Sequence, residues 1–328
     1  MAKVKSLRTS KYMNRSIYLI IITITLLITS CKPLVTDPNI DDISNNPTIS
    51  PSEPENVHQV QTPNAPNQNP SDTDIVGNLI DAEGMTINQR FSSPEGYTRL
   101  PSPTDSFGEF LQNLPLKAHG SKVLYYNGKQ KQRDVYEAVI DLDVGDKDLQ
   151  QCADAVMRLR AEYLYSQQLF DTIHFNFTSG FRADYSKWME GWRIKVNGNN
   201  VDWSKDASFS DDYETFRKYL DMVFIYAGTL SLSQEIKDVP IEDMQIGDVF
   251  IQGGSPGHCV IVVDMAENKE DGTKLFMLAQ SYMPAQDIHI LKNTQDSSLS
   301  PWYPLSFEGS LHTPEYIFEK EDLKRFEE

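Results

Sequence analysis

The chain has 328 residues, with 47 acidic and 30 basic side chains and a formal net charge of −17 at pH 7. This acidic balance argues against nucleic acid as a partner and against charge-driven docking on anionic lipid. Three cysteines are too few for a disulfide framework. A single disulfide bond between Cys152 and Cys259 stays an alternative if the protein enters an oxidising compartment.

The first 30 residues have the pattern of an export signal. Five basic residues precede an apolar run over 16–29 that is too short to cross a bilayer comfortably. Small residues then precede Cys31, which resembles a bacterial lipoprotein signal cut before this cysteine, with lipid attached to its thiol. An uncleaved membrane anchor is the alternative. Because Lys32 follows Cys31, and not the Asp often associated with inner-membrane retention, we expect anchoring to the outer membrane, on its periplasmic or its surface face.

Residues 31–72 are predicted to be a disordered tether. The segment 32–72 has no Phe, Tyr or Trp and holds eight of the 18 prolines. Such a composition buries too little apolar surface to offset the entropy of ordering the chain. The remaining residues, 73–328, are enough for a single globular domain.

Strands and helices are then predicted in turn along this domain. An edge strand and a short helix precede a hairpin that pairs 122–126 with 135–140. A long helix is expected from an N-cap at Asp146 to about residue 169, with Cys152 well inside it on the apolar face. The later predicted elements are a second hairpin (192–196 with 201–203), a helix over 211–226, and a charged terminal helix.

The stretch 246–291 is the centre of the domain. Short β runs at 248–252, 258–263 and 275–279, separated by a Gly-rich turn and a polar loop, predict an antiparallel meander. His258 opens its central strand, and Gln280 ends the next strand. The predicted fold class is therefore α+β, with an antiparallel sheet packed on the Cys-bearing helix.

This arrangement resembles the second half of papain-like cysteine hydrolases of the cell-wall amidase type, the NlpC/P60 group. There a Gly-Asp strand is followed by a strand that opens with the catalytic His, and the next strand supplies a polar residue that orients the imidazole. The resemblance implies a papain-like fold in which Cys152 is the nucleophile, His258 the base and Gln280 the orienting residue.

The sequence departs from that group around the cysteine. In the group, the Cys usually follows an Asp, opens its helix and precedes Ser-Gly, whereas this chain reads Gln151-Cys152-Ala153-Asp154. A thiol inside a helix gains little from the helix dipole. The alternative interpretation is that Cys152 is a small buried apolar residue of the core.

The region after the tether also resembles the DUF4846 family of uncharacterised Bacteroidetes lipoproteins. The strings CADAVMRLRAEYLY, GGSPGHCVIVVD and LAQSYMPAQDIH carry this resemblance. It covers about three quarters of the chain and implies no established activity.

Candidate binding residues support a non-catalytic alternative. Arg158 either pairs with charges along its helix or clamps a polar ligand. Trp188 and Trp192 either pack in the core or line a sugar groove, and Ser281 belongs to the same polar surface as Gln280. No zinc-like spacing occurs, so neither a metal nor a cofactor is expected.

Two functions follow from these observations. The first is a lipid-anchored cysteine hydrolase or amidase that acts on peptide or glycopeptide material of the cell envelope. The second is an envelope module without catalysis that binds a glycan, such as that of peptidoglycan, or a protein partner.

Overall fold

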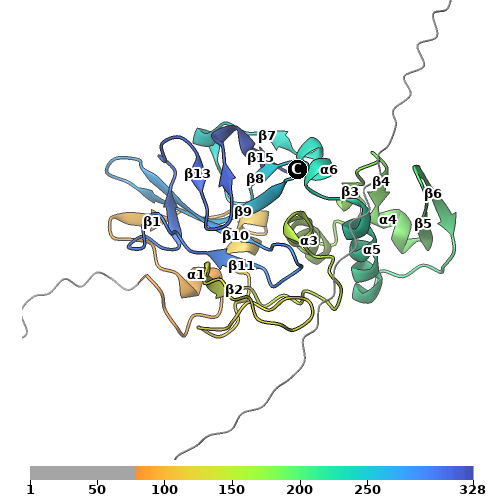
Figure 1. Ribbon diagram of the computed structural model, residues 1–328, viewed down its shortest axis with the longest axis horizontal. Coiled ribbons are helices and arrows are strands. Elements are labelled where there is room, and N and C mark those ends of the chain that lie inside the picture. The colour runs from red at the N-terminus through yellow and green to blue at the C-terminus, as the bar shows by residue number, and fades with distance from the viewer. Residues whose placement is uncertain (1–78, 328) are drawn as a thin grey trace, which may run out of the picture. The chain divides into compact units, whose positions relative to one another are not determined.

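A nine-stranded antiparallel sheet organises residues 79–327, the part of the chain that the computed structural model describes (Figure 1). Its order is β2-β11-β10-β9-β8-β15-β7, with β1 paired to β9 and β12 paired to β10. The strands are β1 (Tyr97–Arg99), β2 (Tyr136–Val139), β7 (Lys237–Asp238), β8 (Val249–Gln252), β9 (His258–Asn268), β10 (Lys274–Gln280), β11 (His289–Leu291), β12 (Trp302–Pro304) and β15 (Leu323–Arg325). This sheet confirms the predicted α+β class and the meander of β8, β9 and β10.

Strand β9 is buried on both faces, which explains its nearly continuous apolar sequence. Cys259 and Ile261 belong to the larger core cluster, which also contains the apolar side of helix α3 (Cys152–Ser166). Val260 and Val262 belong to the core on the opposite face, where Phe318 also packs. The sheet therefore separates two cores, and α3 covers one of its faces (Figure 1).

An insertion between α3 and β8 lies on the side of α3 away from most of the sheet (Figure 1). It contains η1 (Phe170–Thr172), β3 (His174–Asn176), β4 (Arg182–Asp184), α4 (Tyr185–Met189), β5 (Trp192–Asn197), β6 (Asn200–Lys205), α5 (Tyr213–Tyr226) and α6 (Thr229–Glu235). The second predicted hairpin is confirmed as β5–β6, and the helix predicted over 211–226 is confirmed as α5.

The remaining helices and strands of the described residues are short. They are α1 (Ile87–Arg90), α2 (Phe107–Gln112), η2 (Ile241–Asp243), β13 (Leu311–His312), β14 (Ile317–Phe318) and η3 (Lys320–Asp322). Within residues 79–327, no helix combines the length and the apolar character needed to cross a membrane. The predicted signal peptide, Cys31 and the tether 31–72 lie outside the described residues.

The hairpin predicted between 122–126 and 135–140 is wrong. The tight turn at Gly128 does form, with φ of +77°, but it closes only a bridge between Leu124 and Gln130. Strand β2 pairs instead with β11, about 150 residues away in the sequence. Pairing with β11 buries Ala138 and Val139 in the sheet, which the local turn could not do.

The charged terminal helix is also wrong, because its residues form β15 between β8 and β7. Leu323 points into the core beside Phe250, while Lys324 pairs with Asp238 at the surface. Leu323 and Lys324 point to opposite faces of the sheet, as successive residues of a strand do. The backbone of β15 is hydrogen-bonded to the neighbouring strand β8 in antiparallel pairing.

Candidate active site

Cys152 is the first residue of α3, and Gln151 is its N-cap. The prediction that this helix begins at Asp146 and encloses Cys152 is therefore wrong. The segment before the helix is held by other parts of the chain: Asp148 Oδ1 accepts the Ala285 N–H at 2.7 Å, and the Gln150 carbonyl accepts the Ser281 hydroxyl at 3.1 Å. Cys152 consequently lies where the N–H groups of the first turn lack acceptors within the helix and the helix dipole is positive.

His258 opens β9 next to this helix end and is 2 % exposed. Its Nε2 lies 2.8 Å from Gln280 Oε1, and its ring packs between Tyr282 and Tyr316, with centroid separations of 4.8 and 5.1 Å. The Cys152 thiol lies close enough to the His258 imidazole for that ring to favour its ionised form. The structure thus brings together the three residues that the sequence singled out.

The two free thiols of the site have opposite electrostatics. The hydrogen bond from Cys259, together with the hydrogen bond and charge of His258, outweighs burial and lowers the pKa of Cys152 from 9.0 to about 4. Burial raises the pKa of Cys259 well above its usual value, and the neighbouring Cys152 adds to that rise. The environment therefore favours the thiolate form of Cys152 and the neutral thiol form of Cys259.

Cys152 borders a cleft of about 520 Å³. The Gly-rich loop between β8 and β9 forms one side of it, and Tyr282 and Tyr316 also line it. Thr229 fixes that loop, since its hydroxyl donates to the Gly254 carbonyl and accepts the Gly254 N–H, both at 3.3 Å. Cys152 thus meets the cleft directly, while His258 is buried next to the aromatic rings of its wall.

Asp154, one turn into α3, carries a polar atom without a partner in the described structure. Its Oδ2 accepts the Gln151 N–H at 3.0 Å, but its Oδ1 is buried and has no hydrogen bond. Burial raises the pKa of this carboxyl well above its usual value. Asp154 also lines the cleft, so a buried carboxyl group with a raised pKa lies near Cys152.

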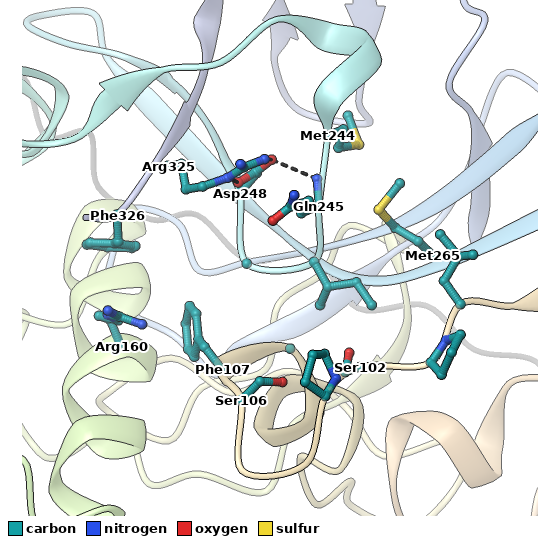
Figure 2. A pocket seen from close by; sticks show the side chains of 16 residues that line it. Ser102, Ser106, Phe107, Arg160, Met244, Gln245, Asp248, Met265, Arg325 and Phe326 are labelled. Carbon is teal, nitrogen blue, oxygen red and sulfur yellow. Dashed lines mark hydrogen bonds and ion pairs between the residues drawn. The ribbon is translucent and has the colours of Figure 1, made fainter. Parts of the chain in front are cut away.

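A second hollow, of about 410 Å³, is lined by residues of the 100–108 segment, the approach to β8 and the C-terminal strand (Figure 2). Asp248 is at its wall, where Arg325 Nε and a terminal guanidinium nitrogen contact the two carboxylate oxygens at 2.6 and 2.8 Å. Neither Cys nor His occurs among the described residues that line it. The described residues of this hollow therefore do not include a thiol and imidazole pair like that of the cleft.

The predicted binding residues do not gather on one surface. Arg158 is 1 % exposed and contacts Glu162 at 2.6 Å, Gln150 at 2.7 Å and the Tyr213 hydroxyl at 3.1 Å. Ser281 is buried and donates to the carbonyls of Gln150 and Gln286. These contacts give both side chains structural roles within the core.

The two tryptophans lie in the insertion. Trp188 is buried and donates its indole N–H to the Thr215 carbonyl at 3.1 Å. Trp192, on β5, is half-buried, and the ammonium group of Lys205 lies 5.4 Å from its ring centroid. Trp188 is thus part of the packing of the insertion, and Trp192 presents part of its ring to solvent. Among the described residues, no group of three or more His, Cys, Asp or Glu side chains could hold a metal ion.

Sequence reasoning missed the residues behind Gln280. Gln280 Nε2 donates to Glu315 Oε2 at 2.7 Å and lies 3.4 Å from His289 Nε2. Glu315 in turn contacts the buried Lys131 at 2.9 Å. Glu315 and Lys131 lie far from Gln280 in the sequence and have no recognisable spacing from it, so no sequence signal could have found them.

Fold and site together define an α+β protein with a Cys-His-Gln constellation at the edge of a cleft. The model of the DUF4846 family, described as a domain of unknown function, matches residues 87–325. The chain belongs to this family. No curated protein and no solved structure matches the chain.

Proposed function

We propose that this protein is a cysteine hydrolase of the papain-like type that cleaves an amide bond in peptide or glycopeptide material of the cell envelope. The observation that carries the proposal is the contact of Cys152, at the first position of α3, with an imidazole whose other nitrogen is 2.8 Å from Gln280 Oε1. A thiol activated by a base that is itself oriented by a third group is the recurring arrangement of covalent catalysis.

The geometry suggests how the bonds are exchanged. Cys152 thiolate attacks the amide carbon and forms the C–S bond of a tetrahedral intermediate, while the N–H of Cys152 stabilises the oxyanion. Protonated His258 gives its proton to the leaving nitrogen as the C–N bond breaks, which releases an amine and leaves a thioester. His258 then takes a proton from water, which hydrolyses the thioester to a carboxylic acid and restores the thiolate.

The proposed location is the cell envelope. Its support is the export signal and the cysteine at position 31, which resemble a bacterial lipoprotein signal. We expect the mature chain to begin at an acylated Cys31 and to be held at the outer membrane by that lipid. Intact-mass analysis would show the acyl groups, and a Cys31→Ser chain that still partitions with membranes would contradict the proposal.

Turnover of peptidoglycan fragments, followed by mass spectrometry of the released amines, tests the catalytic proposal. Cys152→Ser should reduce turnover at least 100-fold, because a serine hydroxyl is not ionised by this environment. Cys259→Ser is the matched control, since it keeps a donor to Cys152 and should retain most of the turnover.

The same assay separates the non-catalytic alternative. Trp192 is half-exposed on β5 and offers an aromatic surface to a sugar. If the wild-type chain binds the fragments without releasing amines, and Trp192→Ala removes that binding, the protein is a binding module and the hydrolase proposal is wrong.

A further inference from the structure

We infer that Glu315 and His289 are positioning residues of this site, which together fix the amide of Gln280 and thereby the tautomer of His258. The catalytic meaning of this inference rests on the proposed function. The contacts that support it do not depend on that function. Glu315 lies between β13 and β14, and His289 begins β11, so three separate segments meet behind the imidazole.

His289 is an acceptor at its Nε2. Its Nδ1 lies 2.9 Å from the Asp287 carbonyl, which can only accept, so Nδ1 carries the proton. Burial lowers the pKa of His289 to about 3, so the ring is neutral and Nε2 keeps its lone pair. The residue is paired with Gln280 in the β10–β11 register, which brings that lone pair to the Gln280 side chain.

Gln280 therefore has an acceptor for each of its two amide hydrogens. Glu315 Oε2 takes one at 2.7 Å, and His289 Nε2 takes the other at the longer distance of 3.4 Å. A flipped amide would turn its carbonyl oxygen toward a carboxylate and a lone pair, which is repulsive. The Gln280 oxygen must accordingly face His258.

The tautomer of His258 follows from the same contacts. Gln280 Oε1 can only accept, so His258 Nε2 carries a proton. Nδ1 is then the nitrogen available to Cys152, with its lone pair free to take the thiol proton. If Glu315 and His289 did not fix the Gln280 amide, either nitrogen of His258 could carry the proton. Only the tautomer protonated at Nε2 leaves Nδ1 free to accept the Cys152 proton.

Glu315 is itself held in place. Both of its oxygens contact Lys131 Nζ, at 3.0 and 2.9 Å, and the two side chains are 3 % and 4 % exposed. Arg133 adds a contact from the surface at 3.2 Å. A buried bidentate contact of this kind leaves the carboxylate one orientation, with Oε2 shared between Lys131 and Gln280.

Replacing Glu315 by Gln tests the inference without using a substrate. The new amide can present either an oxygen or an NH₂ group to Gln280, so Gln280 loses its enforced orientation. Proton-coupled nitrogen NMR of labelled histidine, taken on the neutral form of the ring, should show His258 protonated at Nε2 in the wild type and a mixture of tautomers in Glu315→Gln. The midpoint of Cys152 alkylation against pH should rise by about one unit, roughly a tenfold slower reaction below that midpoint.

Several ionisable groups interact electrostatically with the Cys152 thiol and are left unchanged in all variants of this experiment. They are Cys259, His258, Asp154, Tyr282 and Tyr316. The matched control is Glu308→Gln, an exposed glutamate beyond β12, which should change neither the tautomer nor the midpoint. His289→Leu should produce a smaller shift than Glu315→Gln, because it removes the longer of the two contacts.

Glu315→Gln leaves Lys131 without its charge partner and could unfold the chain. The double variant Lys131→Gln with Glu315→Gln removes both charges and keeps the test applicable. A folded variant whose His258 stays protonated at Nε2 alone, with an unchanged alkylation profile, would overturn the inference. These readouts do not need turnover, so a protein that shows both shifts but cleaves nothing would refute the proposed hydrolase while supporting the positioning roles.

Discussion

The cleft at the start of α3 and the hollow of Figure 2 both bury an aspartate whose pKa is raised by burial, but the oxygens of the two aspartates are paired differently. In the hollow, Asp248 is satisfied by Arg325 and by the Gln245 N–H at 2.8 Å. In the cleft, Asp154 keeps one oxygen without a partner in the described structure, and the neighbouring Cys152 has a pKa near 4.

Volume does not distinguish the two places, since the hollow and the cleft measure about 410 and 520 Å³. The distinction lies in how their polar groups are paired. Fully paired charges stabilise a fold, whereas buried groups whose pKa values are pushed apart mark a place where protons can be exchanged. The comparison therefore supports the cleft, and not the hollow, as the place of the proposed chemistry.

The largest expected effect concerns the reactivity of Cys152 toward iodoacetamide. With its pKa lowered to about 4, the thiolate is fully present above that pH and is lost only as pH falls through it. At pH 6, an unperturbed thiol with a pKa of 9.0 would be roughly one part in a thousand thiolate. Alkylation of Cys152, followed by peptide mass spectrometry, should thus stay fast down to about pH 5.

Cys259 is the internal control for that experiment. Its pKa is raised by burial, and it should remain unlabelled in the folded chain at every pH tested. His258→Ala should move the Cys152 midpoint upward, because it removes a hydrogen bond and a charge that favour the thiolate. If Cys152 reacts only above pH 8, it is an ordinary core thiol, and the contrast between cleft and hollow disappears.

The next effect concerns the ion pair of the hollow. Arg325→Met should lower the free energy of unfolding by about 3 kcal/mol, because Asp248, whose side chain is 1 % exposed, would lose its charge partner. Urea denaturation at neutral pH measures this change, and the alkylation rate of Cys152 should not respond.

A surface ion pair provides the matched control. Lys195 contacts Asp206 at 2.5 Å, but its side chain is 62 % exposed. Lys195→Met should change stability much less than Arg325→Met, because solvent screens such a pair. Equal losses for Lys195→Met and Arg325→Met would show that burial does not give the hollow a special structural role.

The central part of the site could be predicted because the sequence encodes it locally. Turns with Gly bound three short β runs, and these place His258 at the start of one strand and Gln280 at the end of the next. The start of α3 could not be predicted, because Asp146 is as good an N-cap by sequence as any residue nearby. Contacts of Asp148 and Gln150 with the 281–285 segment decide that the helix begins at Cys152.

The support behind Gln280 is a product of long-range register. His289 reaches Gln280 only because β10 and β11 pair with these two residues opposite each other. Glu315 reaches it from the β13–β14 hairpin, 35 residues further along the chain. Neither strand length nor spacing specifies such a register from one sequence, since a slip by one residue would turn each side chain to the other face.

The smallest expected effect tests the unpaired oxygen of Asp154. Because burial raises the pKa of this carboxyl, the folded state retains a proton that the unfolded state releases near pH 3.8. The stability that this carboxyl contributes is fully present below that pH and declines as pH rises. Asp154→Asn replaces it with a neutral side chain of the same shape that can still accept the Gln151 N–H.

The Asp154→Asn variant should accordingly gain stability relative to the wild type as pH rises from 4 to 8. Urea denaturation at the two pH values measures the difference, with Glu308→Gln as the exposed control. If Asp154→Asn is instead less stable at pH 8 than at pH 4 relative to wild type, Asp154 is a charged residue that stabilises the start of α3 through the helix dipole. The cleft would then resemble the hollow, with each buried aspartate in a role that supports the fold.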